Sequence, residues 1–184
     1  MSTREPQPAE LEIPADLEVL FDADTVHERV TELGRQIESE TGSEDPILVG
    51  LLEGSLIFLS DLVRAIRSPV RFELIQVHSG EDSGVIRIEY PIPVDIAGQS
   101  VIVVKDVVAS GVTEPYLEQK LRDHGASRVR FAALVDLPDE RKTDFRPDFV
   151  AFSTPRRGVL AGYGLKHTGR YGNLSFVGRV RGTE

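Results

Sequence analysis

Short runs of consecutive apolar residues alternate along this chain with segments in which apolar residues recur every three or four positions. Most of the runs show no alternation of apolar and polar positions, which is typical of strands buried on both faces of a sheet. Strands are predicted at residues 47–52, 70–77, 85–90, 99–108, 129–137 and 148–153. Helices are predicted at residues 24–37, 56–66 and 114–124. Because strands alternate with helices, we expect an α/β fold with a parallel sheet flanked by helices.

The polar segments set the boundaries of this fold. Residues 1–17 are rich in proline and have no apolar period, so we expect a flexible N-terminal arm followed by one domain over 18–184. Thr25 with Glu28, three residues on, predicts a capping box at the start of the first helix. Residues 78–84 are expected to form a flexible loop between two strands. Residues 139–142 carry charges of both signs and are expected to be a solvated turn.

Charge and cysteine content narrow the possible partners. Thirty Asp and Glu against 21 Lys and Arg give a net charge of -9, which repels nucleic acid and anionic lipid surfaces. With no cysteine, the chain has no disulfide framework, zinc thiolate site or cysteine nucleophile, as a reducing cytoplasm would allow. The polar start predicts neither a secretory signal nor a membrane span. We therefore expect a cytoplasmic protein.

The strand predicted at 99–108 leads into a turn and a helix that together suit a phosphate group. The turn consists of Ala109, Ser110, Gly111, Val112 and Thr113. Backbone N–H groups at the amino end of a helix, two hydroxyls and a glycine that permits close approach form a cradle for a monophosphate. The alternative is a tight turn in which Thr113 only caps the helix.

The cradle and three other segments of the chain resemble motifs of one enzyme family. The segment VVKDVVASGVT at 103–113 resembles the phosphoribosyl-pyrophosphate motif of type I phosphoribosyltransferases. LLEGS at 51–55 is similar to the pyrophosphate loop of the hypoxanthine-guanine branch, SGVIRI at 83–88 to the end of its mobile loop, and GYGL at 162–165 to the end of its purine-binding segment. The resemblance implies a parallel sheet with a small hood, and an activity in purine salvage that uses magnesium.

Several positions depart from the pattern of that family. The family's general base, a carboxylate, corresponds to Ala109, which cannot accept a proton. The first of its two ribose-binding acids corresponds to Lys105, so that Asp106 remains alone. The purine-binding lysine corresponds to Leu137, and the stacking aromatic corresponds to Val159 or the residue before it.

Two charged positions are reversed as well. The lysine of the pyrophosphate loop corresponds to Glu53, which is followed by Gly54 and Ser55 near a second anion position. The acid that helps to hold magnesium corresponds to Lys166, a cation that repels the metal. No catalytic residue and no metal ligand is therefore assigned, and Mg²⁺ is expected only if the chain is active.

These departures favour a divergent family member with impaired catalysis. It is expected to bind a phosphate or nucleotide through residues 109–113 and Asp106. The resemblance further implies a homo-oligomer, or a mixed oligomer with an active paralogue. An active enzyme for an unusual base, with Lys105, Lys166 or Glu53 in new roles, is the alternative. A third possibility is an interaction module that binds no small molecule.

Overall fold

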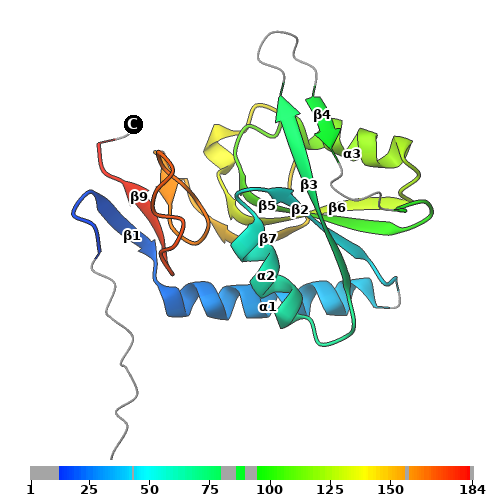
Figure 1. Ribbon diagram of the computed structural model, residues 1–184, viewed down its shortest axis with the longest axis horizontal. Helices are drawn as coiled ribbons and strands as arrows, with labels where there is room; N and C mark the ends of the chain where they lie inside the picture. Colours follow the sequence, from blue (N-terminus) through cyan, green and yellow to red (C-terminus); the bar gives the residue numbers. More distant parts are fainter. Residues whose placement is uncertain (1–12, 43, 80–85, 90–94, 156–157, 183–184) are drawn as a thin grey trace, which may run out of the picture.

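The computed structural model describes residues 13–42, 44–79, 86–89, 95–155 and 158–182. Its main sheet has six strands in the order β4-β3-β2-β5-β6-β7 (Figure 1). The parallel strands are β2 (Ile47–Leu52), β3 (Arg71–Ser79), β5 (Ser100–Val108), β6 (Arg128–Asp136) and β7 (Phe149–Ser153). The edge strand β4 (Ile86–Glu89) runs antiparallel to β3. The predicted parallel α/β sheet is confirmed. The loop expected at 78–84 was placed too early, because His78 and Ser79 still belong to β3, and residues 80–84 lie outside the described residues.

Helices cover both faces of this sheet. The helices α1 (Ala23–Thr41) and α2 (Leu56–Ala65) pack against one face, and α3 (Thr113–Asp123) packs against the other. Successive residues of β5 enter the two cores alternately, which is why its run of valines and isoleucine shows no polar position. No helix among the described residues is long and apolar enough to cross a membrane.

The start of α1 differs from the sequence prediction. Asp22 is the N-cap, and its side chain accepts a hydrogen bond from the backbone N–H of Thr25 at 2.8 Å. The capping box predicted from Thr25 and Glu28 was therefore placed too late in the sequence, because the helix already begins at Ala23. An Asp at this position satisfies one of the N–H groups that the first helical turn leaves unpaired.

A second, smaller sheet lies at one side of the molecule and forms the hood (Figure 1). Its strands, in spatial order, are β1 (Leu17–Phe21), β9 (Val177–Val180) and β8 (Leu160–Ala161). The chain enters this sheet at Asp16, whose backbone carbonyl accepts a hydrogen bond from Arg181 at 2.8 Å. Residues 1–12 of the predicted arm lie outside the described residues, and its flexibility remains a prediction.

Candidate functional site

The carboxyl ends of the central strands bring the predicted site residues to one edge of the sheet. Residues 53–55 follow β2, residues 109–112 follow β5, and residues 137–143 follow β6, the three strands being neighbours in the sheet. A hood loop faces them, because Gly164 approaches Gly54 so closely that a Cβ on Gly164 would lie 3.0 Å from the Gly54 carbonyl oxygen. The site therefore lies between the main sheet and the hood.

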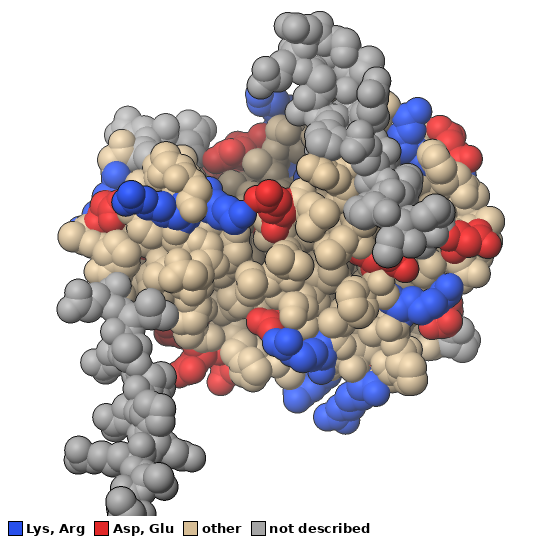
Figure 2. Space-filling view, in the orientation of Figure 1, with Lys and Arg blue, Asp and Glu red and all other residues tan. Residues whose placement is uncertain are grey.

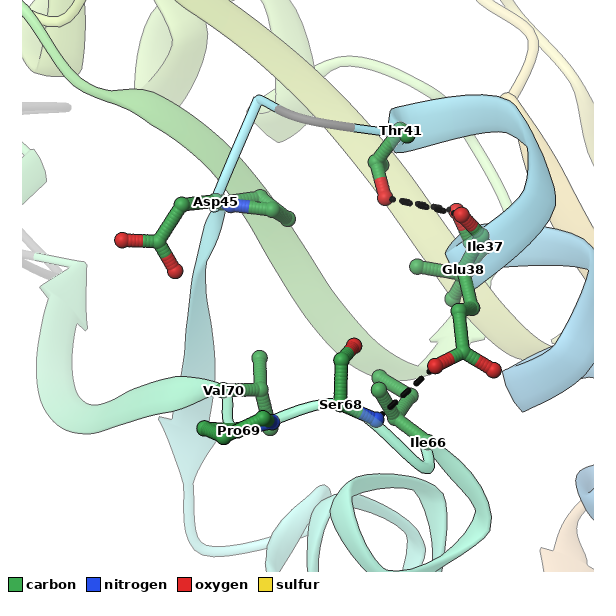
Figure 3. A pocket seen from close by; sticks show the side chains of 10 residues that line it. Ile37, Glu38, Thr41, Asp45, Ile66, Ser68, Pro69 and Val70 are labelled. Atoms are coloured by element: carbon green, nitrogen blue, oxygen red, sulfur yellow. Dashed lines mark hydrogen bonds between the residues drawn. The ribbon is translucent and has the colours of Figure 1, made fainter.

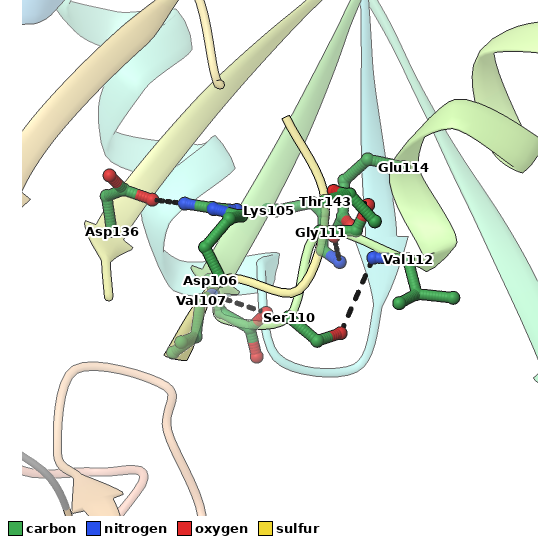
Figure 4. Close-up of polar contacts among 10 residues, drawn as sticks. Lys105, Asp106, Val107, Ser110, Gly111, Val112, Glu114, Asp136 and Thr143 are labelled. Carbon is green, nitrogen blue, oxygen red and sulfur yellow. Dashed lines mark hydrogen bonds and ion pairs between the residues drawn. The ribbon is translucent and has the colours of Figure 1, made fainter. Parts of the chain in front are cut away.

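A left-handed glycine and several hydrogen bonds determine the conformation of the turn after β5. Gly111 has φ +72°, a left-handed value that favours glycine. The backbone N–H of Val112 donates to Ser110 Oγ at 3.4 Å (Figure 4). From the neighbouring segment, Lys142 N–H donates to the Ser110 carbonyl at 2.8 Å, and Thr143 Oγ1 donates to the Gly111 carbonyl at 2.9 Å. The carbonyl groups of Ser110 and Gly111 are therefore held against residues 142–143.

The amino end of α3 completes this cradle. Val112 is the N-cap residue, Thr113 is the first helical residue, and no side-chain cap hydrogen bond is formed there in the described structure. Thr113 lies inside the helix and is therefore not its cap, and the choice between a phosphate cradle and a plain tight turn stays a prediction. The N–H of Val112 itself donates to Ser110 Oγ, whereas the N–H groups of the first helical turn have no side-chain cap, and such groups suit an anion.

Asp106 lies between the cradle and the loop after β2. One of its carboxylate oxygens accepts the backbone N–H of Val107 at 2.8 Å (Figure 4). The other oxygen lies against Gly54, where a Cβ would come within 1.8 Å of it. Ser55 is not directed outward, since it is buried and its hydroxyl donates to the Leu51 carbonyl at 2.7 Å. The structure thus brings Asp106 and Gly54 together and turns Ser55 into the fold.

Lys105 is neutralised inside the protein. Its ammonium group forms an ion pair with the carboxylate of Glu114 on α3, and the two side chains are only 14% and 3% exposed. The Lys105 charge is therefore directed into the fold and is balanced there. The sequence analysis did not identify Glu114 as a partner, although its place in the first turn of the helix after β5 was a usable signal.

The two reversed charges pair with each other across the site. Lys166 Nζ, from the hood, donates to Glu53 Oε2 in the loop after β2 at 2.6 Å. The hydrogen bond from Lys166, followed by the attraction of its charge, lowers the pKa of the Glu53 carboxyl. Figure 2 shows basic and acidic side chains interspersed over the face of the molecule that Figure 1 presents. The Glu53–Lys166 pair links the two sheets at the surface, where the Lys166 and Glu53 side chains are 48% and 73% exposed.

The segment predicted as a solvated turn contributes a partly buried ion pair. Residues Pro138–Glu140 form a short 3-10 helix, and the Arg141 guanidinium pairs with the Asp136 carboxylate at the end of β6. These side chains are 12% and 14% exposed, and the guanidinium lies 5.9 Å from the Phe145 ring centroid. The prediction was wrong for Arg141, because its charge turns back onto the strand end.

The two expected purine-binding positions carry aliphatic side chains. Leu137 is buried in the core that faces α1 and α2, and its N–H donates to the Val108 carbonyl at 2.9 Å. Val159 is 38% exposed and lines, with Ala109 and Ser110, a cavity of about 700 Å³ beside the cradle. Ala109 contributes a methyl group where the resemblance implies a carboxylate.

The donor set does not fit the magnesium ion that the resemblance implies. Magnesium prefers oxygen ligands, and the positions corresponding to family acids hold Lys105 and Lys166. Asp106 remains, but no group of three or more His, Asp or Glu among the described residues is placed to hold a metal ion. We therefore derive no chemical step through a metal.

A second, smaller hollow lies at the opposite edge of the main sheet, and its polar groups form hydrogen bonds within the protein. It measures about 130 Å³ and lies between the end of α1 and the segment 66–70 that leads to β3 (Figure 3). Glu38 accepts the Ser68 N–H there, and Thr41 donates to the Ile37 carbonyl, both at 2.8 Å. These polar groups are engaged within the fold, so the hollow carries no site.

A parallel sheet with a glycine turn and helix after its central strand, facing a small second sheet, defines the class of type I phosphoribosyltransferases. Residues 19–166 match the family model described as a phosphoribosyl transferase domain. The chain belongs to the hypoxanthine-guanine phosphoribosyltransferase family, which is the family that the sequence resemblance indicated.

Individual relatives cover nearly the whole chain. A hypoxanthine-guanine phosphoribosyltransferase of Mycobacterium avium is 39% identical over 95% of this chain and 90% of its own length. A hypoxanthine-guanine phosphoribosyltransferase of Bacillus subtilis is 32% identical over 89% of this chain and 92% of its own length. The crystal structure of a Bacillus anthracis hypoxanthine-guanine phosphoribosyltransferase has a TM-score of 0.81 at 32% identity, covering 89% of this chain and 97% of that one. The fold with its hood is thus confirmed.

Proposed function

We propose that this chain is a catalytically impaired member of its family that binds a phosphorylated small molecule. The observation that carries the proposal is the Ala109 methyl group at the start of the cradle, at the position of the family's general base. Loss of a general base alone typically lowers the rate by about 10² to 10⁴. Phosphate binding needs only the N–H groups and hydroxyls of the cradle, which do not depend on that carboxylate.

Four of the carboxylates near the cradle support this proposal because each is already engaged. Asp136 is paired with Arg141, Glu53 with Lys166, and Glu114 with Lys105. Asp106 accepts a backbone N–H from its own strand. Any of these four would have to give up its contact before it could act as a substitute base.

The engaged cations support the loss of leaving-group stabilisation in the same way. A departing pyrophosphate needs positive charge or N–H donors placed where its charge develops, and removal of one such donor typically costs about 10² to 10³ in rate. Lys166 and Arg141, which lie at the hood and beside the cradle, are both paired with carboxylates, the first at the surface and the second with Nη1 of its guanidinium left without a hydrogen-bond partner. The rate losses from the missing base and from the missing leaving-group stabilisation are not additive, but both slow the same reaction.

We expect no turnover from either the natural chain or its Ala109→Asp variant. Each protein is incubated with phosphoribosyl pyrophosphate, Mg²⁺ and a panel of purine and pyrimidine bases, and released pyrophosphate is measured. The added carboxylate restores the base but leaves Leu137 without a polar group and Lys166 at the metal position. Both rates should therefore stay at least about 10⁴-fold below that of an active relative.

The Bacillus subtilis relative, assayed in parallel, serves as the positive control. Turnover by the natural chain with any base would overturn the proposal and support an enzyme with a rewired site. Strong activity of Ala109→Asp alone would show that Leu137 and Lys166 do not block the reaction. Absence of binding by every phosphorylated ligand would favour an interaction module.

We also propose that the chain forms an oligomer through α2 and β3. Leu56, Ile57 and Phe72 on these elements are 47%, 40% and 53% exposed. Phe72 is paired in register with Leu48, which is buried on the side of α1 and α2, so it lies on the face that α2 covers. Leu56 and Ile57 follow the carboxyl end of β2 and Phe72 lies near its amino end, so we expect a partner surface that spans this face from one end of the strands to the other.

Sedimentation velocity should then show a dimer or larger species for the natural chain and a smaller species for Phe72→Glu. Glu73→Gln, on the neighbouring position of the same strand, is the matched control. A monomer at all concentrations would contradict a homo-oligomer. A mixed species formed only with an active family member would identify a paralogue as the partner.

A further inference from the structure

A hollow with arginines around it lies between α1 and α2, away from the cradle. It measures about 280 Å³. The two helices are closely packed beside it, because a Cβ on Gly34 would lie 2.6 Å from the Cβ of Ala65. Arg35 of α1, Arg64 of α2 and Arg67 just after α2 line the hollow. In Figure 2, Lys and Arg side chains gather at the lower part of the face shown, where Figure 1 places these two helices.

The acidic residue of this hollow is already engaged. Asp61 is the one acid among the described residues that line it. Asp61 Oδ1 pairs with the Arg64 guanidinium, and Asp61 Oδ2 accepts the Tyr163 hydroxyl at 2.6 Å. Arg64 also donates to Ser60 Oγ at 3.1 Å. The carboxylate of Asp61 and the guanidinium of Arg64 therefore balance each other.

The other two arginines keep their positive charge uncompensated. Arg35 and Arg67 are exposed, and neither forms an ion pair with a described residue. Glu38 accepts the Ser68 N–H at 2.8 Å, and this bond, together with the more distant charge of Arg67, lowers the pKa of the Glu38 carboxyl. On a chain with a net charge of -9, such a surface attracts an anion that the rest of the protein repels.

An adjoining hollow extends this surface towards the hood. It measures about 330 Å³, and it shares His27 and Asp61 with the first hollow. Its apolar lining includes Ile57, which is 40% exposed and also belongs to the oligomer surface proposed above. We call the two hollows together the α1–α2 groove. Along α2, Ile57 and Arg64 are about 10 Å apart, which is the length of about three extended residues.

An apolar end and a basic end within this distance suit a segment of a protein. Arginine binds carboxylates with a planar fork of N–H donors. A uniform polyanion would leave the apolar end empty and would meet Asp61 in the middle of the groove.

We infer that the α1–α2 groove binds an acidic segment of a partner protein. An apolar side chain of this segment lies beside Ile57, and carboxylates three or four residues further on pair with Arg35 and Arg67. The interaction goes beyond the proposed function, since it requires neither catalysis nor an occupied cradle.

Fluorescence anisotropy of the full chain with labelled synthetic peptides tests this inference. The probe is Leu-Ser-Glu-Glu-Glu, and it is compared with Leu-Ser-Gln-Gln-Gln and with Ser-Ser-Glu-Glu-Glu. The probe should bind about tenfold more tightly than the glutamine peptide, because two arginine–carboxylate pairs contribute that much. It should bind at least about fivefold more tightly than the peptide without leucine, because that peptide buries no apolar side chain.

A double charge reversal locates the binding surface. Arg35→Glu/Arg67→Glu should weaken the probe at least about tenfold, because two attractions become repulsions. Arg146→Glu/Arg181→Glu is the matched control, since it makes the same change of net charge at exposed positions before β7 and after β9. Thermal melts by circular dichroism should show both variants folded, because these four arginines form no ion pair with a described residue.

Several results would overturn the inference. These are equal affinity for the probe and the glutamine peptide, or unchanged affinity in Arg35→Glu/Arg67→Glu. Inorganic polyphosphate that binds more tightly than the probe, and is weakened by the same variant, would identify a phosphate polymer as the partner. A tenfold gain in probe affinity in Glu10→Gln/Glu12→Gln would identify the chain's own N-terminal segment as the occupant. All of these outcomes leave impaired catalysis intact, because that proposal is tested by turnover.

Discussion

Glu114→Ala is expected to lower the free energy of unfolding by about 3–5 kcal/mol, because it leaves the Lys105 ammonium without its partner inside the fold. The two side chains are 3% and 14% exposed, so water cannot readily replace the lost carboxylate. The charge of Lys105 must then be buried unpaired or given up as a proton, and both cost free energy. Equilibrium unfolding in urea, followed by circular dichroism, measures the change.

Two further variants test whether the expected loss of stability comes from leaving a buried charge unpaired. In Lys105→Met/Glu114→Leu both charged groups are replaced by apolar ones of similar volume, and the double variant should be within about 1 kcal/mol of the natural chain. Glu118→Ala breaks the exposed pair with Arg122 on the same helix and should cost less than about 1 kcal/mol. If Glu114→Ala cost no more than Glu118→Ala, the Lys105–Glu114 pair would not be a buried interaction in solution.

Gly111→Asp is expected to abolish phosphate binding, with at least a hundredfold loss of affinity for ribose 5-phosphate. A Cβ at this position would lie 2.6 Å from Thr143 Oγ1 and 2.7 Å from Arg141 Cδ, so the turn must shift. The new carboxylate would also repel the phosphate dianion at close range, which costs several kcal/mol. Calorimetric titration measures the affinity, and a thermal melt reports the accompanying loss of stability.

Gly98→Asp is the matched control for this substitution. Gly98 has the same φ of +72°, but no atom lies within 4 Å of the position its Cβ would take. It therefore adds the same charge and the same backbone strain away from the cradle, and binding should be retained. If Gly111→Asp failed to fold, Ser110→Ala/Thr113→Ala would remove the two hydroxyls more gently and should still weaken binding. Unchanged affinity in a folded Gly111→Asp would show that the cradle is not the ligand site.

The main sheet was predictable from sequence because its strands are buried on both faces. Val101 and Val103 enter one core while Ile102 and Val104 enter the other, so the run has no polar position. The hood strands gave no such signal. The strand β8 has two residues and β9 has four, which is too short for a period to emerge, and the hood was expected only from the family resemblance.

The cradle is local in sequence, whereas the ion pairs around it join residues that only the tertiary structure brings together. The cradle could be located from sequence because strand, turn and helix follow one another along the chain. The ion pair of Glu53 with Lys166 joins residues 113 positions apart, so nothing local indicated it. Arg141 was misjudged because a charge beside other charges is usually solvated, whereas here the short helix after β6 turns it back toward Asp136.

The pairing of β1 with β9 has a consequence for the order in which this protein forms during synthesis. Glu18 and Arg179 of these two strands are joined by an ion pair although 161 positions separate them. At about 5–20 residues per second, the first strand emerges from the ribosome roughly 10–30 s before its partner. The phosphate cradle lies on the main sheet and can be complete by then. The hood therefore assembles after the main sheet, and Leu17 and Val19 stay uncovered until β9 has been synthesised.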